Sequence, residues 1–192
     1  FPPKTQDAAE KLYRTIADLE ALKPSFVSVT HGAGGSTREM THDLVVRINQ
    51  TTQVETVPHL TCVCHKEAEV RAILERYATA GVGNILALGG DPPVHGAAPM
   101  PSDYRFSGEL VEDVREFGGF SIGVAAHHEL HPRSTDRASD RQHLADKLKR
   151  ADFGITQFFF DIDHYLQMVD ELAALGADQP IIPGIMPISN LG

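Results

Sequence analysis

Short apolar segments alternate with amphipathic helical segments along the chain, and this alternation constrains the fold more than any other feature. Strands that are joined by helices lie parallel, because each connection crosses back to start the next strand in the same direction. Polar residues stand at the ends of several apolar segments: Thr30-His31, His59-Leu60-Thr61-Cys62, Gly89-Gly90-Asp91, His127-His128 and Gln157. The pattern is typical of a TIM (β/α)8 barrel, whose active site lies at the carboxyl ends of the strands.

The hydrophobic periodicity predicts the individual elements. Strands are predicted at 26–30, 56–62, 84–88, 121–126, 154–160 and 181–185. Helices are predicted at 7–22, 66–80, 109–117, 139–151 and 163–175, with one more after a capping box at 36–39. The first helix is expected to begin with a capping box formed by Asp7 and Glu10. The stretches 92–106 and 129–138 read as long loops, which in compact domains are often functional.

Composition narrows the class of protein. The 192 residues are near the size of one domain, and the net charge is 17 − 26 = −9. This charge argues against a nucleic-acid or anionic-membrane surface, so we expect neither partner. No apolar run approaches the roughly 18 residues of a membrane span, and no signal peptide is visible.

The only cysteines are Cys62 and Cys64, which are too close together for a relaxed disulfide on a strand. Their spacing is not that of a zinc site, so both are expected to be small buried residues. A reducing compartment therefore fits the chain best, and we predict a cytoplasmic location.

A closed barrel needs eight strands, whereas the chain starts at Phe1 without a methionine and stops soon after the strand at 181–185. We therefore expect an incomplete barrel that lacks most of strand 1 and strand 8. Residues 1–192 are predicted to form a single catalytic-barrel segment that is truncated at both ends. Open sheet edges should make such a segment marginally stable.

Two glycine-containing loops follow predicted strands. Gly32-Ala33-Gly34 invites a dinucleotide-binding interpretation, but Thr37 stands where the third glycine of that fingerprint belongs. A loop whose glycines let the backbone approach a ligand is favoured instead. Gly89-Gly90-Asp91-Pro92-Pro93 forms a rigid turn that presents Asp91 at a strand end. The alternative is an aspartate in an ordinary turn, where this residue is common.

The segment His127-His128-Glu129-Leu130-His131-Pro132 gathers three histidines near one strand end. Its spacing is not the His-Glu-x-x-His that places two metal ligands on one helix face, and Pro132 argues against a helix. Histidines that line a polar ligand pocket are favoured, and no metal site is expected. A metal hydrolase and plain solvent-exposed histidines are the alternatives.

Gln157 lies inside an otherwise apolar strand, Ile155-Thr156-Gln157-Phe158-Phe159-Phe160-Asp161. A buried amide is costly unless it is paired, and a glutamine can both donate to and accept from a heterocycle. Gln157 is therefore a candidate ligand-binding residue. The aromatic run 158–160 is expected to belong to the core rather than to a stacking platform.

Taken together, these motifs resemble those of methylenetetrahydrofolate reductases along essentially the whole chain. The segments that carry the resemblance are 1–5, 26–30, 58–62, 88–92, 124–126, 131–132, 155–161 and 182–187. The resemblance implies a flavin-dependent (β/α)8 barrel of one-carbon metabolism and methionine biosynthesis. Such an enzyme takes hydride from NADH or NADPH onto FAD and then reduces 5,10-methylenetetrahydrofolate to 5-methyltetrahydrofolate. It also implies folate and nicotinamide as small-molecule partners, and we expect a homo-oligomer.

The resemblance also implies roles for individual residues. Asp91 looks like the catalytic aspartate beside the flavin and the pterin, and Gln157 like the residue that contacts the pterin. An anion at Asp91 should disfavour a negatively charged reduced flavin and favour the cationic iminium form of the folate. The positions that match the FAD site are Thr30, His31, Ala33, His59, Gly89, Gly90, Asp91, His127, His131, Asp140, His143 and Lys147. Lys147 offers the positive charge that a pyrophosphate needs.

The chain departs from the family pattern at three flavin-site positions. Gly89 stands in place of the usual arginine, His127 in place of tyrosine, and Asp146 in place of a common basic residue. Each departure removes a usual flavin contact, so weaker FAD binding is expected. The family's general acid is a glutamate that would lie two positions before Phe1. A non-catalytic flavin- or folate-binding barrel is therefore the alternative to an enzyme.

Overall fold

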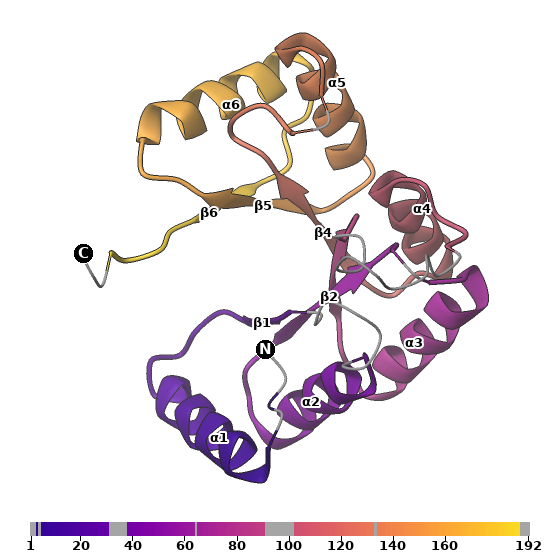
Figure 1. The fold of residues 1–192 in the computed structure, drawn as a ribbon, viewed down its shortest axis with the longest axis vertical. Coiled ribbons are helices and arrows are strands. Elements are labelled where there is room, and N and C mark those ends of the chain that lie inside the picture. The colour runs from indigo at the N-terminus through magenta and orange to yellow at the C-terminus, as the bar shows by residue number, and fades with distance from the viewer. Residues whose placement is uncertain are drawn as a thin grey trace, which may run out of the picture. The chain divides into compact units, whose positions relative to one another are not determined.

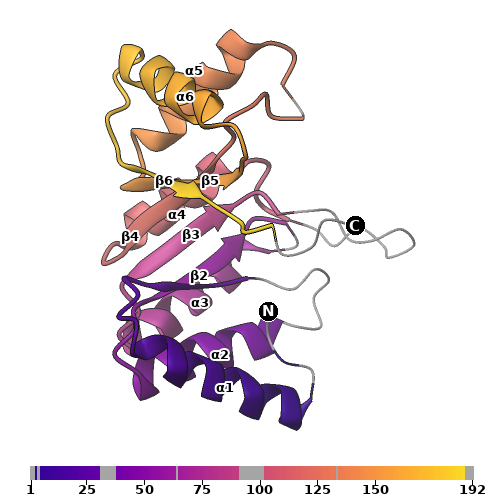
Figure 2. The same ribbon diagram turned by 90° about the vertical axis from the view of Figure 1, so that its left-hand side faces the viewer.

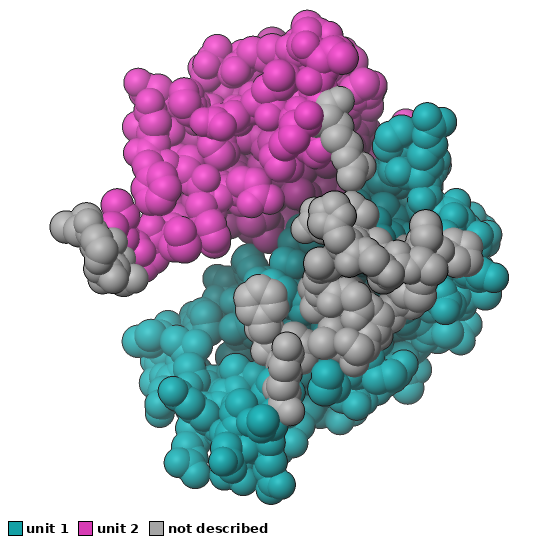
Figure 3. Space-filling model, in the orientation of Figure 1, with its two compact units in different colours: residues 1–121 teal, residues 122–192 magenta. Residues whose placement is uncertain are grey.

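The computed structural model describes residues 3, 5–30, 38–63, 65–90, 102–132 and 134–188 (Figure 1). The chain divides into two compact units, unit 1 (Phe1–Ser121) and unit 2 (Ile122–Gly192), which Figure 3 colours separately. Each unit is a run of parallel strands joined by helices, and each is described by itself. That the whole chain is one barrel segment stays a prediction.

Unit 1 alternates helices and strands from its first described element. The elements are α1 (Gln6–Glu20), β1 (Val27–Val29), α2 (Arg38–Thr51), β2 (Thr56–Thr61), α3 (Glu67–Thr79), β3 (Asn84–Leu88) and α4 (Ser107–Phe117). The three strands are parallel and adjacent in sequence order, with Val27 opposite Thr56 and His59 opposite Leu86. Figure 2 shows α1 and α2 together on one side of β1 and β2.

The core of unit 1 lies between its strands and its helices. Leu60 of β2, Ile85 of β3 and Val45 of α2 are fully buried. The buried ring of His42 on α2 lies 2.6 Å from the hydroxyl of Tyr77 on α3, measured from Nδ1 to Oη. Burial lowers the pKa of His42 to about 4, so this histidine is neutral at pH 7 and serves the packing of two helices.

Unit 2 repeats the same pattern with three further strands. Its elements are β4 (Ser121–Ala126), α5 (Arg137–Leu148), β5 (Phe153–Phe158), α6 (Ile162–Ala174) and β6 (Ile181–Gly184). The strands are again parallel and in sequence order, with Val124 opposite Gly154 and Ile155 opposite Ile182. In Figure 1, α5 and α6 lie on the same side of β5 and β6. Ile122, Val124, Leu148, Met168 and Leu172 form its fully buried core.

All six predicted strands are present and parallel, and β3 and β4 have the predicted bounds. The predicted fold class, an incomplete TIM (β/α)8 barrel, is therefore confirmed as an architecture of parallel strands alternating with helices. The other elements with predicted bounds begin and end within two residues of them, except that α5 ends three residues early, since helix and strand ends depend on caps and on neighbours. Of the residues that the structure describes, no helix is long and apolar enough to cross a membrane.

Two local predictions are wrong. The first helix begins one residue before Asp7, and Thr5 caps it, because the Thr5 hydroxyl accepts from the Ala8 amide at 3.2 Å. The aromatic run after β5 is not core, since Phe158 is 55% exposed and Phe160 is 72% exposed. The sheet ends at Phe158, so the next residues leave the strand instead of facing a second layer. Phe159 is half-buried, and its ring stacks 5.5 Å from the ring of Tyr165.

Candidate functional site

Two predicted site residues of unit 1 lie at or near the ends of adjacent strands. Thr30 follows β1 directly, and its hydroxyl oxygen is buried with no hydrogen-bond partner among the described residues. His59 lies in β2 and is half-buried, and burial lowers its pKa to about 4. The His59 imidazole is therefore neutral at pH 7 and can donate one hydrogen bond and accept another. Both side chains are suited to the polar edge of a bound ligand.

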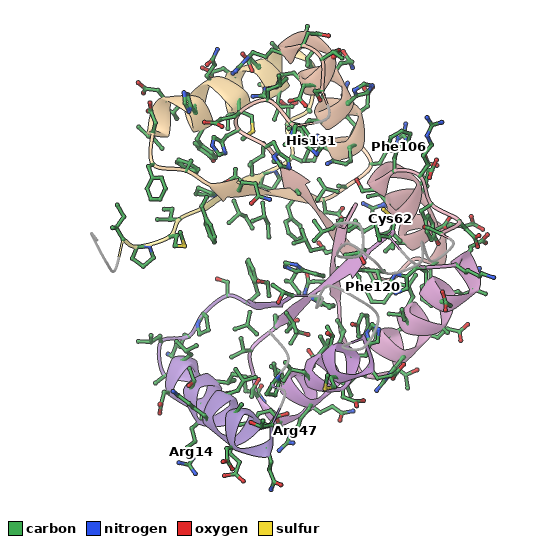
Figure 4. All side chains as sticks on the ribbon, in the orientation of Figure 1. Arg14, Arg47, Cys62, Phe106, Phe120 and His131 are labelled. Atoms are coloured by element: carbon green, nitrogen blue, oxygen red, sulfur yellow. The ribbon has the colours of Figure 1, made fainter. Side chains whose placement is uncertain are left out.

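The turn after β3 is fixed by contacts with the end of β2. The Cys62 amide donates to the Leu88 carbonyl at 3.0 Å, and the Val63 amide donates to the Gly89 carbonyl at 3.1 Å. The buried thiol of Cys62, labelled in Figure 4, donates to the Gly89 carbonyl at 3.1 Å. Pairing of β2 with β3 thus continues beyond the two strands. The prediction that Cys62 is a small buried residue is confirmed, whereas Cys64 lies outside the described residues.

The two glycines of this turn differ in what they tolerate. Gly90 has a φ of +79°, and a Cβ placed there would lie 3.0 Å from the Cβ of Thr61, so only glycine fits without strain. Gly89 is exposed, and among the described residues nothing lies within 4 Å of a Cβ placed there. The turn therefore requires Gly90, while Gly89 leaves room for a long side chain.

Three predicted site residues lie outside the described residues: His31, Ala33 and Asp91. The catalytic role of Asp91 and the flavin contacts of the other two therefore stay predictions. Gln157, the predicted pterin contact, is exposed near the end of β5 in unit 2. It is not the buried amide that its apolar neighbours predict, because the strand leaves the core at this point. An exposed amide remains free to meet a ligand.

In unit 2, the loop between β4 and α5 brings two predicted residues together. The rings of His127 and His131 lie 4.6 Å apart, edge to face, and Figure 4 labels His131 in this loop. Burial lowers the pKa of His127, and the neighbouring His131 and Lys147 lower it further. His127 is therefore held neutral in this pair, which leaves it able to donate to or accept from a ligand.

Lys147 on α5 places a cation beside the end of β4. Its ammonium donates to the Ala125 carbonyl at 2.9 Å, which uses one of its three N–H groups. Burial lowers the pKa of Lys147 to about 8, while Asp140 opposes that shift. Lys147 therefore carries a positive charge at pH 7 that is poorly hydrated, and such a charge binds an anion well.

Asp140 anchors the β4–α5 loop. One carboxylate oxygen accepts from the Ser134 hydroxyl at 2.6 Å and from the His131 amide at 3.3 Å. The other accepts from the guanidinium of Arg141 at 2.8 Å. Both carboxylate oxygens already accept hydrogen bonds that hold the loop, so the structure gives Asp140 a positioning role. Its predicted place in the FAD site stays a prediction.

Arg141 is the site residue that sequence reasoning missed. Its side chain is 3% exposed, and its guanidinium donates to the main-chain carbonyls of His127, His128 and Glu129 at 3.1, 2.6 and 3.3 Å. The same group donates to the Glu171 carboxylate on α6 at 2.7 Å. Most of its partners are backbone carbonyls, which leave no residue pattern in the sequence. Arg141 therefore ties the loop to both α5 and α6.

The remaining predicted residues have weaker structural support. His143 is exposed on α5, and its cofactor contact stays a prediction. Asp146, one of the departures from the family pattern, is half-buried and accepts from the Gln142 amide at 2.8 Å. The predicted meeting of Thr30, His59 and Asp91 with His127, His131 and Gln157 at one barrel mouth also stays a prediction.

The described residues fit the chemistry of FAD, the cofactor that the resemblance implies. A flavin dinucleotide presents polar ring edges and a pyrophosphate anion. In unit 1, the unpaired hydroxyl of Thr30 and the neutral ring of His59 can form hydrogen bonds with polar edges of the flavin ring. In unit 2, the positive charge of Lys147 can bind the pyrophosphate anion. The paired rings of His127 and His131 belong to the same unit.

Similar folds occur among solved structures with other activities. Oxaloacetate acetylhydrolase is similar with a TM-score of 0.56 and 12% identity, covering 87% of this chain and 70% of that protein. A 2,3-dimethylmalate lyase is similar with a TM-score of 0.53 and 9% identity, covering 90% of this chain and 73% of that one. Identities this low show a likeness of fold alone.

The relatives found by sequence show the family of the chain, which the likeness of fold does not. The 5,10-methylenetetrahydrofolate reductase of Pectobacterium carotovorum subsp. carotovorum is 41% identical over 191 residues, covering 99% of this chain. That of Escherichia coli (strain K12) is 40% identical over 192 residues, and methylenetetrahydrofolate reductase (NADH) 1 of Arabidopsis thaliana is 37% identical over 205. The chain spans 63% of the length of the two bacterial relatives and 34% of the plant one. The family profile of methylenetetrahydrofolate reductase matches residues 1–192, and the chain belongs to that family.

Proposed function

We propose that the protein formed by this chain reduces 5,10-methylenetetrahydrofolate to 5-methyltetrahydrofolate, with FAD as cofactor and NADH or NADPH as reductant. The observation that carries the proposal is the 41% identity to a 5,10-methylenetetrahydrofolate reductase over 99% of the chain. The polar strand-end residues of both units agree with it, because they supply neutral donors and one cation for an anionic cofactor. We also propose a place in one-carbon metabolism and methionine biosynthesis, a cytoplasmic location and a homo-oligomeric assembly.

Each unit offers candidate residues for holding the cofactor. Thr30 and His59 would meet polar edges of the flavin, and His127 and His131 would line its site from the β4–α5 loop. Lys147 would neutralise the pyrophosphate, with its remaining N–H groups directed at phosphate oxygens. When bound, FAD supplies the hydride transfer between nicotinamide and folate that amino-acid side chains cannot perform.

The folate would be recognised by Asp91 and Gln157. Gln157 is exposed near the end of β5, where its amide can both donate to and accept from a pterin edge. Asp91 would act as a fixed anion that stabilises the cationic iminium form of the folate. It is the one residue to which we assign a catalytic role.

A combined binding and turnover experiment tests the proposal. The purified protein should carry or take up FAD, seen in its visible spectrum. It should then oxidise more than one equivalent of NADH or NADPH per bound FAD only when 5,10-methylenetetrahydrofolate is present. Lys147→Met should weaken FAD binding, because it keeps most of the stem and removes the charge. Lys149→Met is the matched control, since Lys149 is exposed just after α5.

The outcome also separates the two candidate functions. Product formation at wild-type FAD occupancy supports the enzyme. FAD uptake without any folate-dependent oxidation supports the non-catalytic binder. Absence of FAD uptake, or equal FAD affinity in both lysine variants and wild type, would refute the assigned cofactor site.

A further inference from the structure

Three side chains of unit 2 form a cluster that the proposed reaction does not use. His128 and Glu129 lie in the β4–α5 loop, and His164 lies in the first turn of α6. One donor atom from each lies within 4.8 Å of the other two. Nδ1 of His164 lies 3.7 Å from Oε1 of Glu129. The two histidine rings are stacked, with centroids 6.2 Å apart and planes inclined by 21°.

His128 supplies an independent sign of a missing ligand. The residue is 8% exposed, yet its Nδ1 is buried with no hydrogen-bond partner among the residues that the structure describes. A buried polar atom without a partner costs free energy, so such atoms are rare unless an ion or a water satisfies them. The ring also packs against Phe159, with ring centroids 5.5 Å apart.

The backbone that carries the cluster is held in place by one buried group. Arg141 donates to the carbonyls of His128 and Glu129, and it also donates to Glu171 on the helix that carries His164. The first turn of α6 is capped by Asp161, whose carboxylate accepts from the Asp163 amide at 3.0 Å. Both sides of the cluster are therefore fixed before any ion binds, which favours affinity.

The donor set selects the class of metal. Two imidazole nitrogens and one carboxylate suit Zn²⁺, which binds such ligands tetrahedrally at about 2.0–2.2 Å and accepts a water as its fourth ligand. Ca²⁺ needs six to eight oxygen ligands, and imidazole disfavours Mg²⁺. Tetrahedral ligands at those lengths lie roughly 3.3 Å apart, so the cluster must contract by about 1–1.5 Å at its widest pair. Glu129 and His164 are exposed and can rotate to close that gap.

From this geometry we propose that His128, Glu129 and His164 bind one Zn²⁺ ion, with a water as its fourth ligand. The bound ion adds a second link between the β4–α5 loop and the start of α6, beside the one that Arg141 makes. That loop also carries His127 and His131, so the ion further restrains the backbone of the candidate flavin contacts. The proposal does not depend on the proposed function, because it concerns metal binding alone.

Calorimetric titration of chelator-treated, dialysed protein with ZnCl₂ tests the site. The protein should take up one Zn²⁺ per chain. Glu129→Gln and His164→Gln should each weaken binding by about tenfold or more, because each removes a direct ligand. Glu75→Gln and His143→Gln are the matched controls. Both replace an exposed side chain of the same type outside the cluster, so they should bind like wild type. All four sites are exposed, and thermal unfolding of each variant checks that it folds.

Two further measurements distinguish Zn²⁺ bound by the three cluster residues from Zn²⁺ bound elsewhere on the protein. Co²⁺ in place of Zn²⁺ should give visible absorption bands of a tetrahedral site in wild type and in both controls, but not in the two ligand variants. Hydrogen exchange of amides 127–131 should slow on Zn²⁺ addition in the same three proteins only. No saturable uptake would overturn the proposal. Equal uptake by wild type and both ligand variants would show an adventitious ion only, and loss of binding in His143→Gln would overturn the ligand set.

Discussion

The buried guanidinium of Arg141 donates to the carboxylate of the adjacent Asp140 at 2.8 Å, and the two side chains together hold the loop that follows β4. Asp140 accepts from the His131 amide, while Arg141 donates to three consecutive carbonyls from His127 onward. A loop needs such anchors because it has no ladder of backbone hydrogen bonds of its own. The candidate flavin contacts of unit 2 are thus positioned by a buried ion pair.

Replacing Arg141 should destabilise the protein strongly. In Arg141→Met the Asp140 carboxylate stays buried without its partner, which costs about 3–5 kcal/mol of unfolding free energy. Arg137→Met is the matched control, because Arg137 also contacts Glu171 but is 41% exposed, and exposed pairs contribute about 0–1 kcal/mol. Urea denaturation of both variants gives the comparison. Equal losses in the two variants would show that the buried pair has no special role.

Gly89→Arg should strengthen FAD binding. The family usually has arginine here, and in this chain the space around the Gly89 Cβ position is open among the described residues. The substitution adds a cation without strain at the end of β3. Gly108→Arg is the control, because it adds the same charge in α4, where a Cβ also meets no described atom within 4 Å. Flavin fluorescence titration gives the two dissociation constants. An unchanged or weaker affinity in Gly89→Arg would argue against a flavin contact at this turn.

FAD affinity should fall as the pH rises through about 8. Lys147 is protonated below its pKa, which burial lowers to about 8, and it loses its charge above that value. A pyrophosphate binds the charged form, so the dissociation constant should increase on the alkaline side only. Lys147→Met should bind FAD more weakly and without this alkaline change. Titrations between pH 6 and pH 9, at about unit spacing, measure the effect. A pH dependence that survives in Lys147→Met would have to come from another group.

Acid should destabilise unit 1 through His42. Its folded pKa is about 4, below the model-compound value of 6.5, so the unfolded chain binds the proton more readily. Stability is therefore full above about pH 6.5 and is lost as the pH falls toward 4. This one histidine accounts for about 2 kcal/mol of loss at pH 5. His42→Gln should show a shallower decline of unfolding free energy between pH 7 and pH 5. Parallel pH profiles for the two proteins would contradict the assignment.

The sequence reveals the architecture because buried strands must be apolar, so the apolar segments mark where the strands lie. Segments such as 84–88 and 121–126 are apolar enough to be strands in any context, and both match the structure at both ends. Ends that depend on caps are harder to predict, as Thr5 shows by capping α1 ahead of Asp7. The exposure of Phe158 and Phe160 depends on the course of the chain after the end of β5, and an apolar run does not predict that course.

The residues of the candidate site also differ in whether the sequence alone reveals them. Strand-end polar residues such as Thr30 and His59 can be found from their position along the chain. Arg141 cannot be found in this way, because most of its partners are main-chain carbonyls, and its partner on α6, Glu171, lies 30 residues away. The approach of His164 to Glu129 is equally invisible, since it arises only when α6 packs beside the β4–α5 loop.

The most direct test of the proposed reaction is stopped-flow measurement of its two halves in wild type and in Asp91→Asn. Wild type should oxidise reduced nicotinamide first and then form 5-methyltetrahydrofolate from 5,10-methylenetetrahydrofolate. The substitution keeps the shape of the side chain and removes its charge. Nicotinamide oxidation should therefore change little, while folate reduction should lose about 2–4 kcal/mol of transition-state stabilisation. Equal slowing of both halves, or no 5-methyltetrahydrofolate from wild type at full FAD occupancy, would contradict the account.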